Sequence, residues 1–265
     1  MALLSQSKAV QTNNLSKTEA EEWLVYLLHQ TNKEVRRRYS WHVVKGYWPM
    51  KAVQKGKAEK NPKFIVNHHT GGSKTNPVIY RFLQSKKASS QAVIERNGNI
   101  LALASHEDAC YHAVPRGNSP LAPLAIRRLL NIERGWLNEY GIETIGNGNK
   151  WLFTPEQFKS LIVLQRLLVA FYPSIDSIKS HREFSPTSRS GDPGPLYFLP
   201  LVEHAIFNDV DLNDDSYWLH KYEQNPIEFA NQIKTWFNFY EVSNRDEWKN
   251  YRRREITRRN ILEIK

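Results

Sequence analysis

The sequence predicts an α/β protein, with an α/β core over residues 59–202 and a helical, basic extension at each end. Two observations support this prediction. Short apolar runs suited to buried strands alternate with helical patterns through the middle of the chain. The ends instead combine helical patterns with clusters of lysine and arginine. We therefore expect three segments, over residues 1–58, 59–202 and 203–265, and we find no internal repeat.

Residues 15–31 predict the first helix. Ser16 and Glu19 have the spacing of a capping box, in which two side chains satisfy free amides of the first turn. The apolar residues that follow recur on one helical face: Ala20, Trp23, Leu24, Leu27 and Leu28. A polar linker over residues 51–62 separates this helix from the core, so we place the boundary near residue 58.

Three segments of the core predict strands. Residues 63–67 (KFIVN) form a short apolar run that ends at a pair of histidines and a glycine-rich loop. Residues 91–104 predict a hairpin, with Asn97-Gly98 as a two-residue turn because both positions accept positive φ. Residues 140–145 (YGIETI) predict a third buried strand.

A second helix is predicted to begin after Thr154. Thr154 is a suitable cap, Pro155 suits the first turn, and Gln157 completes a capping box. The pattern ends at Tyr172-Pro173. Residues 225–240 (NPIEFANQIKTWFNFY) predict a helix in the aromatic, charged tail.

The net charge of +10 over 265 residues indicates attraction to a polyanion. Nucleic acid, an anionic membrane and an anionic cell wall all fit this description. Much of the excess lies in residues 249–259, with a smaller cluster at 33–38. Charge alone does not choose among these partners, and solvated helical faces are the simpler interpretation.

A single cysteine, Cys110, excludes an intrachain disulfide and a zinc site with several thiolates. We expect it to be a small buried hydrophobic residue. No apolar run is long enough to span a bilayer. The first residues lack a basic start followed by an apolar stretch, so we expect no secretory signal.

Three side chains are candidates for a metal site. His68 ends an apolar strand, and His181 follows the strand-like run 174–180 and opens a loop that holds Asp192 between glycine and proline. Two neutral imidazoles and a carboxylate can bind zinc and leave its fourth position open for water. Spacing alone does not establish that these three residues bind a metal. His69 is the alternative to His68, and only one of the two can easily be a ligand, because neighbouring strand residues face opposite sides. Four histidines lack neighbouring ligands and are discounted: His29, His42, His204 and His220.

Five blocks follow one another in the sequence: IVNHHTGG, SSQAVIERNGNILALASHEDACYHAV, YGIETIGNG, TPEQFKSLIVLQRLL and SHREFSPTSRSGDPGP. In this order they resemble the zinc N-acetylmuramoyl-L-alanine amidases of the amidase_2 family. The family includes amidase-type phage endolysins, muropeptide-recycling amidases and animal peptidoglycan recognition proteins. The resemblance covers roughly residues 60–197. It implies a central mixed β-sheet flanked by helices, with one catalytic zinc ion in a surface groove.

The resemblance also implies roles for individual residues. The zinc ligands are expected to be His68, His181 and Asp192, and Glu143 matches the general acid/base of relatives. His112 matches a histidine of the groove that contacts substrate. We also assign His69 and Asn67, which flank the first ligand, to substrate binding.

The sequence departs from the family's pattern at several positions. Ser90-Gln91 stands where many relatives carry a tyrosine or histidine pair, which makes a tyrosine-based mechanism unavailable and favours Glu143. Ser190 replaces a lysine two residues before the last ligand, and Arg189 is our candidate for its role. Residues 115–139 exceed the family's short connection, and we expect them to form a helix over the groove.

These observations predict zinc-dependent hydrolysis of the amide bond between N-acetylmuramic acid and L-alanine in peptidoglycan. The alternatives are a non-catalytic peptidoglycan-binding module of the same fold and a cytoplasmic muropeptide-recycling amidase. A specific nucleic-acid partner is not expected, because no recognition motif is present. We expect synthesis in the cytoplasm and action on the wall after release or particle-borne delivery, with the basic extensions binding the wall or a particle.

Overall fold

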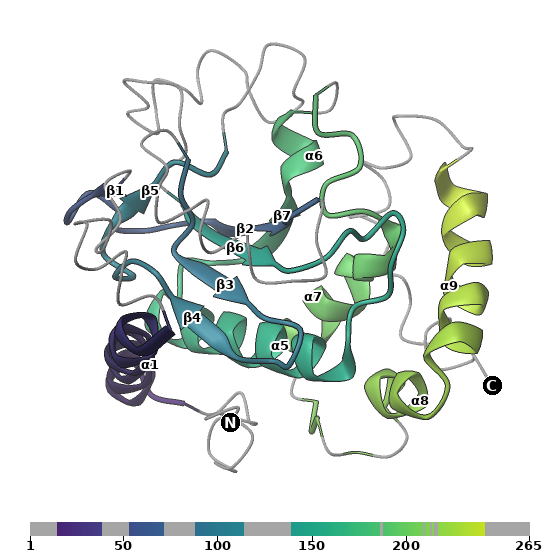
Figure 1. Cartoon of the computed structure of the whole chain (residues 1–265), viewed down its shortest axis with the longest axis horizontal. Coiled ribbons are helices and arrows are strands. Elements are labelled where there is room, and N and C mark those ends of the chain that lie inside the picture. Colours follow the sequence, from purple (N-terminus) through teal and green to yellow (C-terminus); the bar gives the residue numbers. More distant parts are fainter. Residues whose placement is uncertain are drawn as a thin grey trace.

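The computed structural model describes residues 15–38, 53–71, 88–113, 139–185, 188–208, 210–212, 214 and 217–241. A five-stranded sheet lies at its centre, in the order β4-β3-β6-β2-β7 (Figure 1). The strands are β2 (Phe64–His69), β3 (Ala92–Ile94), β4 (Ile100–Ala102), β6 (Tyr140–Thr144) and β7 (Ser177–Ser180). A separate two-stranded sheet pairs β1 (Val53–Gln54) with β5 (Ala109–Cys110).

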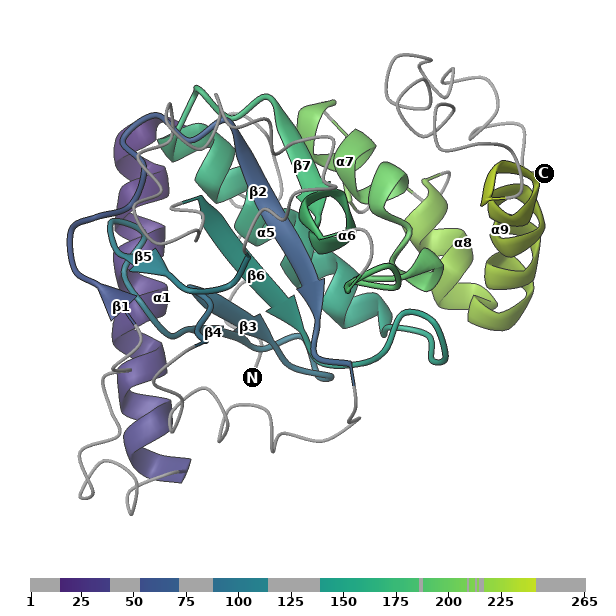
Figure 2. The same ribbon diagram turned by 90° about the horizontal axis from the view of Figure 1, so that it is seen from above.

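The central sheet is mixed, as predicted. β2 pairs in parallel with both β6 and β7, and β3 pairs in parallel with β6. Only β4 runs antiparallel to its neighbour, because it is the second strand of a hairpin. The carboxyl ends of β2, β6 and β7 therefore meet at one edge of the sheet, side by side in Figure 2. Residues that follow these strands are brought together there.

The hairpin turn differs from the predicted two-residue turn. Glu95 and Asn99 close the loop, because the Glu95 amide donates to the Asn99 carbonyl at 2.9 Å. Gly98 has a φ of 79°, whereas Asn97 keeps a negative φ. The loop thus contains three residues with glycine in the left-handed position, which is the next commonest hairpin connection.

Helices cover both faces of the sheet. Helix α5 (Pro155–Phe171) packs under one face, and its predicted capping box between Thr154 and Gln157 is present (Figure 1). Helix α1 (Lys17–Arg38) packs against α5 and β4, and the short α6 (His181–Phe184) lies on the other side of the sheet. Leu24 and Leu27 of α1 share one core cluster with α5 and the sheet.

Helix α1 runs seven residues beyond the predicted end. Its capping box forms, since the Ser16 amide donates to Glu19 at 2.8 Å. The extra turns are held because Val35 is buried and because Arg38 pairs with Glu34 and with Glu95 of the hairpin. Arg37 also pairs with Glu34. Two cations of the basic cluster at 33–38 are therefore already neutralised by carboxylates.

The C-terminal region is helical, as predicted. It contains α7 (Leu199–Phe207), α8 (Trp218–Gln224) and α9 (Pro226–Glu241). Edge and stacked contacts among aromatic rings join these helices to α5; the rings are Phe158, Phe198, Trp218, Tyr222 and Phe229. Residues 249–259 lie outside the described part of the chain. The proposed domain boundaries near 58 and 202 remain predictions.

Cys110 is buried and free, as expected, and burial raises the pKa of its thiol well above the usual range. Among the described residues, no helix is long and apolar enough to cross a membrane. The helix expected over residues 115–139 lies outside the described residues, apart from Glu139.

Candidate metal centre

His68 and Glu143 lie side by side at the carboxyl edge of the sheet. The parallel register pairs His68 of β2 directly with Glu143 of β6. Because side chains at paired positions point to the same face, the imidazole and the carboxylate share the face opposite α5. The ladder continues past the strands through a bond from the Thr70 amide to the Thr144 carbonyl at 3.1 Å, which fixes this end of both strands.

His181 and Asp192 reach the same place from β7 and the loop that follows it. His181 is the first residue of α6, and the Ser180 amide donates to Glu183 at 3.0 Å to set the turn. The loop returns to this helix, since the Arg182 amide donates to the Asp192 carbonyl at 3.0 Å. The Asp192 carboxylate is oriented by the His69 amide, which donates to its Oδ1 at 2.9 Å.

Three ligand atoms converge. Nδ1 of His68 lies 3.0 Å from Nδ1 of His181 and 3.7 Å from Oδ2 of Asp192. Nδ1 of His181 lies 3.1 Å from Oδ2 of Asp192. Ligand atoms about 2.0–2.1 Å from a tetrahedral zinc ion are about 3.3 Å apart. The three separations bracket this value, so the donor set fits zinc in chemistry and in spacing. Within the described residues, this is the cluster that could hold a metal ion.

The electrostatics of the cluster suit a divalent cation. Burial lowers the pKa of His68 to about 4, so its imidazole is neutral at pH 7 and can offer a lone pair. Burial opposes ionisation of Asp192, but the imidazoles of His181 and His68 outweigh it and hold the pKa of the carboxyl well below its usual range. The site therefore presents a neutral nitrogen of His68 and a negative oxygen of Asp192, with Nδ1 of His181 beside both.

Glu143 has a carboxylate oxygen that is not satisfied by the protein. Its Oε2 is buried and has no hydrogen-bond partner among the described residues. Burial raises the pKa of Glu143 well above its usual value, the Asp192 charge raises it further, and Arg189 opposes both. An unpaired carboxyl with a raised pKa beside a metal-ligand cluster is suited to taking and returning a proton.

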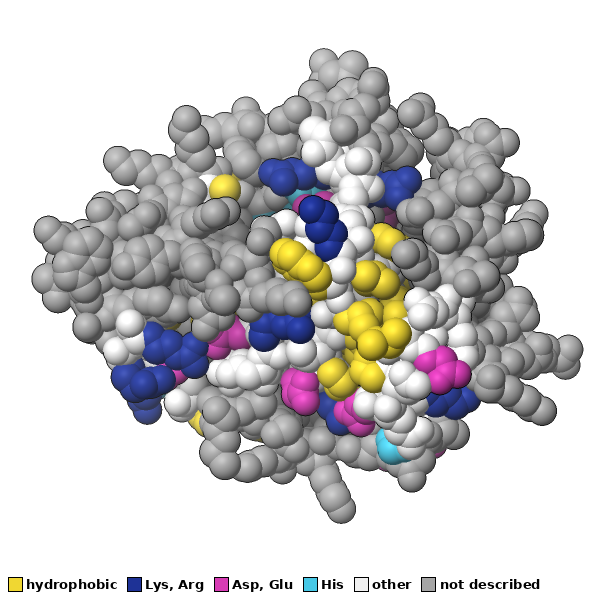
Figure 3. Space-filling view, turned by 45° about the vertical axis from the view of Figure 1, so that its right-hand side comes forward, with side chains coloured by type: hydrophobic (Ala, Val, Ile, Leu, Met, Phe, Trp, Pro, Cys, Tyr) yellow, Lys and Arg dark blue, Asp and Glu magenta, His cyan; other side chains and the backbone are white. Residues whose placement is uncertain are grey.

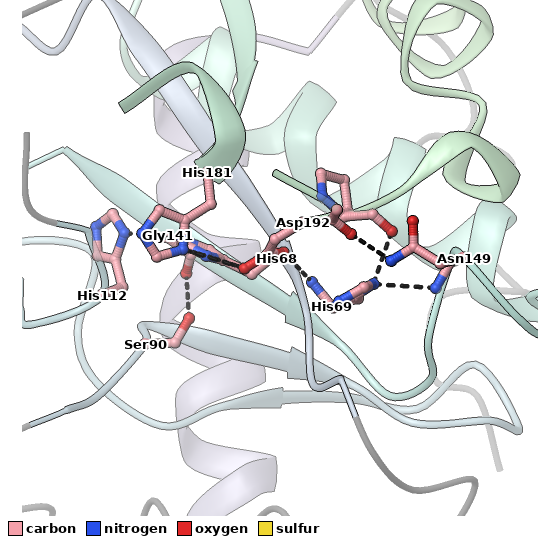
Figure 4. A network of polar contacts seen from close by, with 11 residues as sticks. His68, His69, Ser90, His112, Gly141, Asn149, His181 and Asp192 are labelled. Atoms are coloured by element: carbon pink, nitrogen blue, oxygen red, sulfur yellow. Dashed lines mark hydrogen bonds and ion pairs between the residues drawn. The ribbon is translucent and has the colours of Figure 1, made fainter. Parts of the chain in front are cut away.

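His69 holds two loops together. Its ring Nδ1 lies 2.7 Å from the Pro193 carbonyl and 3.0 Å from the Gly148 amide (Figure 4). The backbones of Gly148 and Pro193 approach each other so closely that a Cβ added at Gly148 would lie 2.0 Å from the Pro193 carbonyl oxygen. Asn149 adds a bond to the Gly191 carbonyl. His69 thus packs against the loop of Asp192, on the other side from the cluster.

His112 contacts the cluster from its outer side. Its Nδ1 lies 3.1 Å from Nε2 of His68, and its Nε2 lies 2.8 Å from the Glu139 carbonyl (Figure 4). The ring is buried, with 7% of the residue exposed. Ser90 and Gln91 hold Gly141 near the start of β6, since the Ser90 hydroxyl donates to the Gly141 carbonyl and the Gln91 side chain accepts from the Gly141 amide.

Asn67 and Arg189 occupy contrasting positions. Asn67 is fully buried on the α5 side, where it donates to Gln165 at 3.2 Å and accepts from the Tyr197 hydroxyl at 2.9 Å. Because it faces away from His68, this position does not support the predicted contact with substrate. Arg189 is exposed, and its charge acts on His68 and Glu143.

Some contributors to the site were missed in the sequence. Gly148, Asn149 and Gly194 join the loop of Asp192 to the loop after β6, and a Cβ at Gly194 would lie 2.5 Å from the Gly148 carbonyl carbon. The signal that could have indicated this contact is the glycine-rich stretch at residues 146–148, directly after the predicted strand 140–145.

The cluster is largely buried, since His68, His181 and Asp192 are 1%, 7% and 6% exposed. In Figure 3, histidine and acidic side chains are visible in a small recess bordered by lysine and arginine side chains, with hydrophobic side chains gathered beside it.

Comparison with known proteins gives one family. Residues 58–195 match the amidase_2 family, described as N-acetylmuramoyl-L-alanine amidase. No curated protein is similar enough to count as a match.

Several solved structures are similar to part of the chain. The amidase LysCS, an endolysin from Clostridium intestinale URNW, is 24% identical over 53% of this chain and 78% of its own, with a TM-score of 0.37. A selenomethionine derivative of AmpD is 21% identical over 55% and 84%, with a TM-score of 0.40. The Ph2119 endolysin from a Thermus scotoductus bacteriophage is 18% identical over 57% and 88%, with a TM-score of 0.40. The family match alone spans just over half of the chain, and the protein therefore belongs to the N-acetylmuramoyl-L-alanine amidase family.

Proposed function

We propose that this protein is a zinc-dependent amidase that hydrolyses the bond between N-acetylmuramic acid and L-alanine in peptidoglycan. The observation that carries the proposal is the convergence of two imidazole nitrogens and one carboxylate oxygen beside Glu143, in a chain of this family. His68, His181 and Asp192 would hold the zinc ion. When bound, zinc supplies Lewis-acid polarisation of the scissile carbonyl and activation of water.

Glu143 is the proposed general base and acid. It takes a proton from the attacking water, whose oxygen adds to the carbonyl carbon of the lactyl group. It then returns that proton to the nitrogen of L-alanine as the carbon–nitrogen bond breaks, which leaves a carboxylic acid on the glycan and a free amine on the peptide. Its raised pKa places this exchange nearer to neutral pH than an ordinary glutamate would.

Arg189 is the proposed partner of the oxyanion that develops on the lactyl carbonyl. Its side chain is exposed beside the cluster, and its positive charge already acts on Glu143. A cation at this position stabilises charge that appears only in the transition state. In this proposal it takes the role of the lysine that relatives carry and that Ser190 replaces here.

We further propose that the basic ends hold the enzyme near an anionic wall by salt-sensitive attraction. The pairs of Arg37 and Arg38 with carboxylates leave residues 249–259 as the principal candidate for this role. The proposed place of action is the cell wall, reached after release or delivery from the producing cell.

Mass spectrometry of products released from purified sacculi tests the function. We expect glycans without peptides, together with intact stem peptides that begin with a free L-alanine amine. Both products should disappear with a metal chelator and in Asp192→Ala. They should persist in the matched control Asp176→Ala, which removes an exposed aspartate before β7.

Other results of this experiment would identify a different function or reject a proposed ligand. Zinc binding without bond cleavage would identify a peptidoglycan-binding module in place of an enzyme. Cleavage of soluble muropeptides but not of sacculi would identify a recycling amidase. Full activity in Asp192→Ala would reject this residue as a ligand.

A further inference from the structure

We propose that His112 is a positioning residue that fixes the tautomer of His68, so that Nδ1 of His68 is always the nitrogen presented to the metal. This inference rests on the proposed zinc site and assigns His112 a role other than substrate contact. It is based on a chain of hydrogen bonds that begins at a backbone carbonyl.

The Glu139 carbonyl decides where the protons lie. A carbonyl oxygen only accepts hydrogen bonds, so Nε2 of His112, 2.8 Å away, must carry a proton. In a neutral imidazole the other nitrogen, Nδ1, is then an acceptor. It lies 3.1 Å from Nε2 of His68, which must therefore be the donor of that bond.

The consequence appears at the far side of the His68 ring. With its proton on Nε2, neutral His68 carries a lone pair on Nδ1. That atom is the one within 3.0 Å of Nδ1 of His181 and 3.7 Å of Oδ2 of Asp192. The opposite tautomer would place a proton among the three donor atoms. Metal-binding histidines commonly gain their orientation and basicity from a partner at the second nitrogen.

The strand beneath the His112 ring is shaped to receive it. A Cβ added at Gly141 would lie 2.4 Å from Cγ of His112, so any larger residue would displace the ring. Gly141 is itself held on both sides, by the Ser90 hydroxyl at 2.7 Å and by the Gln91 side chain at 2.8 Å. Figure 4 shows Ser90, Gly141, His112 and His68 in this arrangement.

The His112 ring is buried, and both of its nitrogens are engaged, one by His68 and one by the Glu139 carbonyl. A ring with both nitrogens occupied has none left for a substrate. His112 therefore acts through His68.

The first test measures the tautomer directly in the wild-type protein. Long-range proton–nitrogen NMR of the metal-free protein, with imidazole signals assigned by the loss of one set in His68→Gln, reports which nitrogen carries the proton. We expect His68 with its proton on Nε2 before any metal is added. A proton on Nδ1 of His68 would overturn the proposal, whether or not the protein later proves to be an amidase.

The second test measures zinc affinity by competition with a chelator. His112→Phe keeps the ring volume but removes the acceptor, and we expect zinc affinity to fall by about 10- to 100-fold. His112→Asn can place its Oδ1 near the former Nδ1, so we expect it to recover most of that loss. The control His106→Phe replaces another buried histidine away from the cluster and should bind zinc as the wild type does.

Equal zinc affinity in His112→Phe and the wild type would overturn the inference. A variant that fails to fold leaves the wild-type tautomer as the deciding measurement. If the tautomer is as expected and the protein binds zinc but cleaves no sacculi, the proposed function fails while the role of His112 stands.

Discussion

Asn67 and His68 are neighbours in the chain, yet their side chains serve opposite faces of the sheet. His68 faces the metal-ligand cluster, whereas Asn67 joins a buried polar network with Gln165 and Tyr197 under the sheet. This alternation follows from strand geometry, in which successive side chains point to opposite sides. At the scale of single residues, the strand register therefore decides which polar groups perform chemistry and which stabilise the core.

Glu143→Gln separates catalysis from metal binding. Glutamine has nearly the same shape but cannot exchange a proton, so we expect activity on sacculi to fall by about 10²- to 10⁴-fold. Zinc affinity should change little, because Glu143 is not among the three converging ligands. Release of stem peptides and chelator competition measure the two properties. The exposed Glu22→Gln on α1 is the matched control, and undiminished activity in Glu143→Gln would exclude the proposed base.

At the scale of elements, the ion pair that joins Arg38 of α1 to Glu95 of the hairpin is more buried than the pair between Arg37 and Glu34 within α1. Arg38 donates through Nη1 to both oxygens of Glu95, at 2.8 and 2.9 Å, and Glu95 is only 2% exposed. Arg37, in contrast, is largely exposed and pairs within its own helix. Removing one partner of a buried pair leaves an uncompensated charge, whereas a surface pair contributes little.

Arg38→Leu should therefore destabilise the fold far more than Arg37→Leu. For Arg38→Leu we expect a loss of about 2–3 kcal/mol, which is below the cost of breaking a fully buried pair because Arg38 is partly exposed. For Arg37→Leu we expect little change, because its ion pair is exposed to solvent. Urea unfolding measures both. Adding Glu95→Gln to the Arg38→Leu variant should recover part of the loss, and equal effects of the two arginine variants would contradict this interpretation.

Local signals in the sequence predicted elements better than they predicted contacts between them. The capping boxes at Ser16 and Thr154 depend on residues three apart, and both formed where expected. The length of α1 depended on Glu95, which is 57 positions from Arg38, and no local pattern reports such a pair. The position of Asn67 could have been predicted from strand alternation. The contact between His112 and His68 could not be predicted from a local pattern, because it depends on the register of β2 and β6.

At the scale of the whole molecule, a buried carboxyl makes stability depend on pH. Both oxygens of Glu139 are buried and lack a hydrogen-bond partner among the described residues. Burial raises the pKa of Glu139 to about 8, and the nearby amides of Lys63 and Phe64, which miss hydrogen-bond geometry, offset this only in part. The folded state thus holds a proton that the unfolded state has released.

An acid whose pKa is raised on folding contributes most to the free energy of unfolding below the pKa that it has in the unfolded state. This contribution is lost as the pH rises toward the pKa of the folded state. We therefore expect the melting temperature of the wild type to fall between pH 6.5 and 8. Below this window, the lowered pKa of His68 acts in the opposite direction between about pH 4 and 6.5. Glu139→Gln should show a flatter profile by calorimetry, and identical profiles would contradict the assignment.

The packing of α1 against α5 bears on how this protein can be divided. The segment that matches the family begins at residue 58, so it omits Ala20, Leu24 and Leu27, which are buried against the rest of the core. It also stops before Leu201 and Trp218. A fragment trimmed to that segment would expose to water the apolar residues that pack against α1, α7 and α8. We expect such a fragment to precipitate on expression or to require detergent. The full-length chain, assayed in parallel for light scattering, provides the comparison.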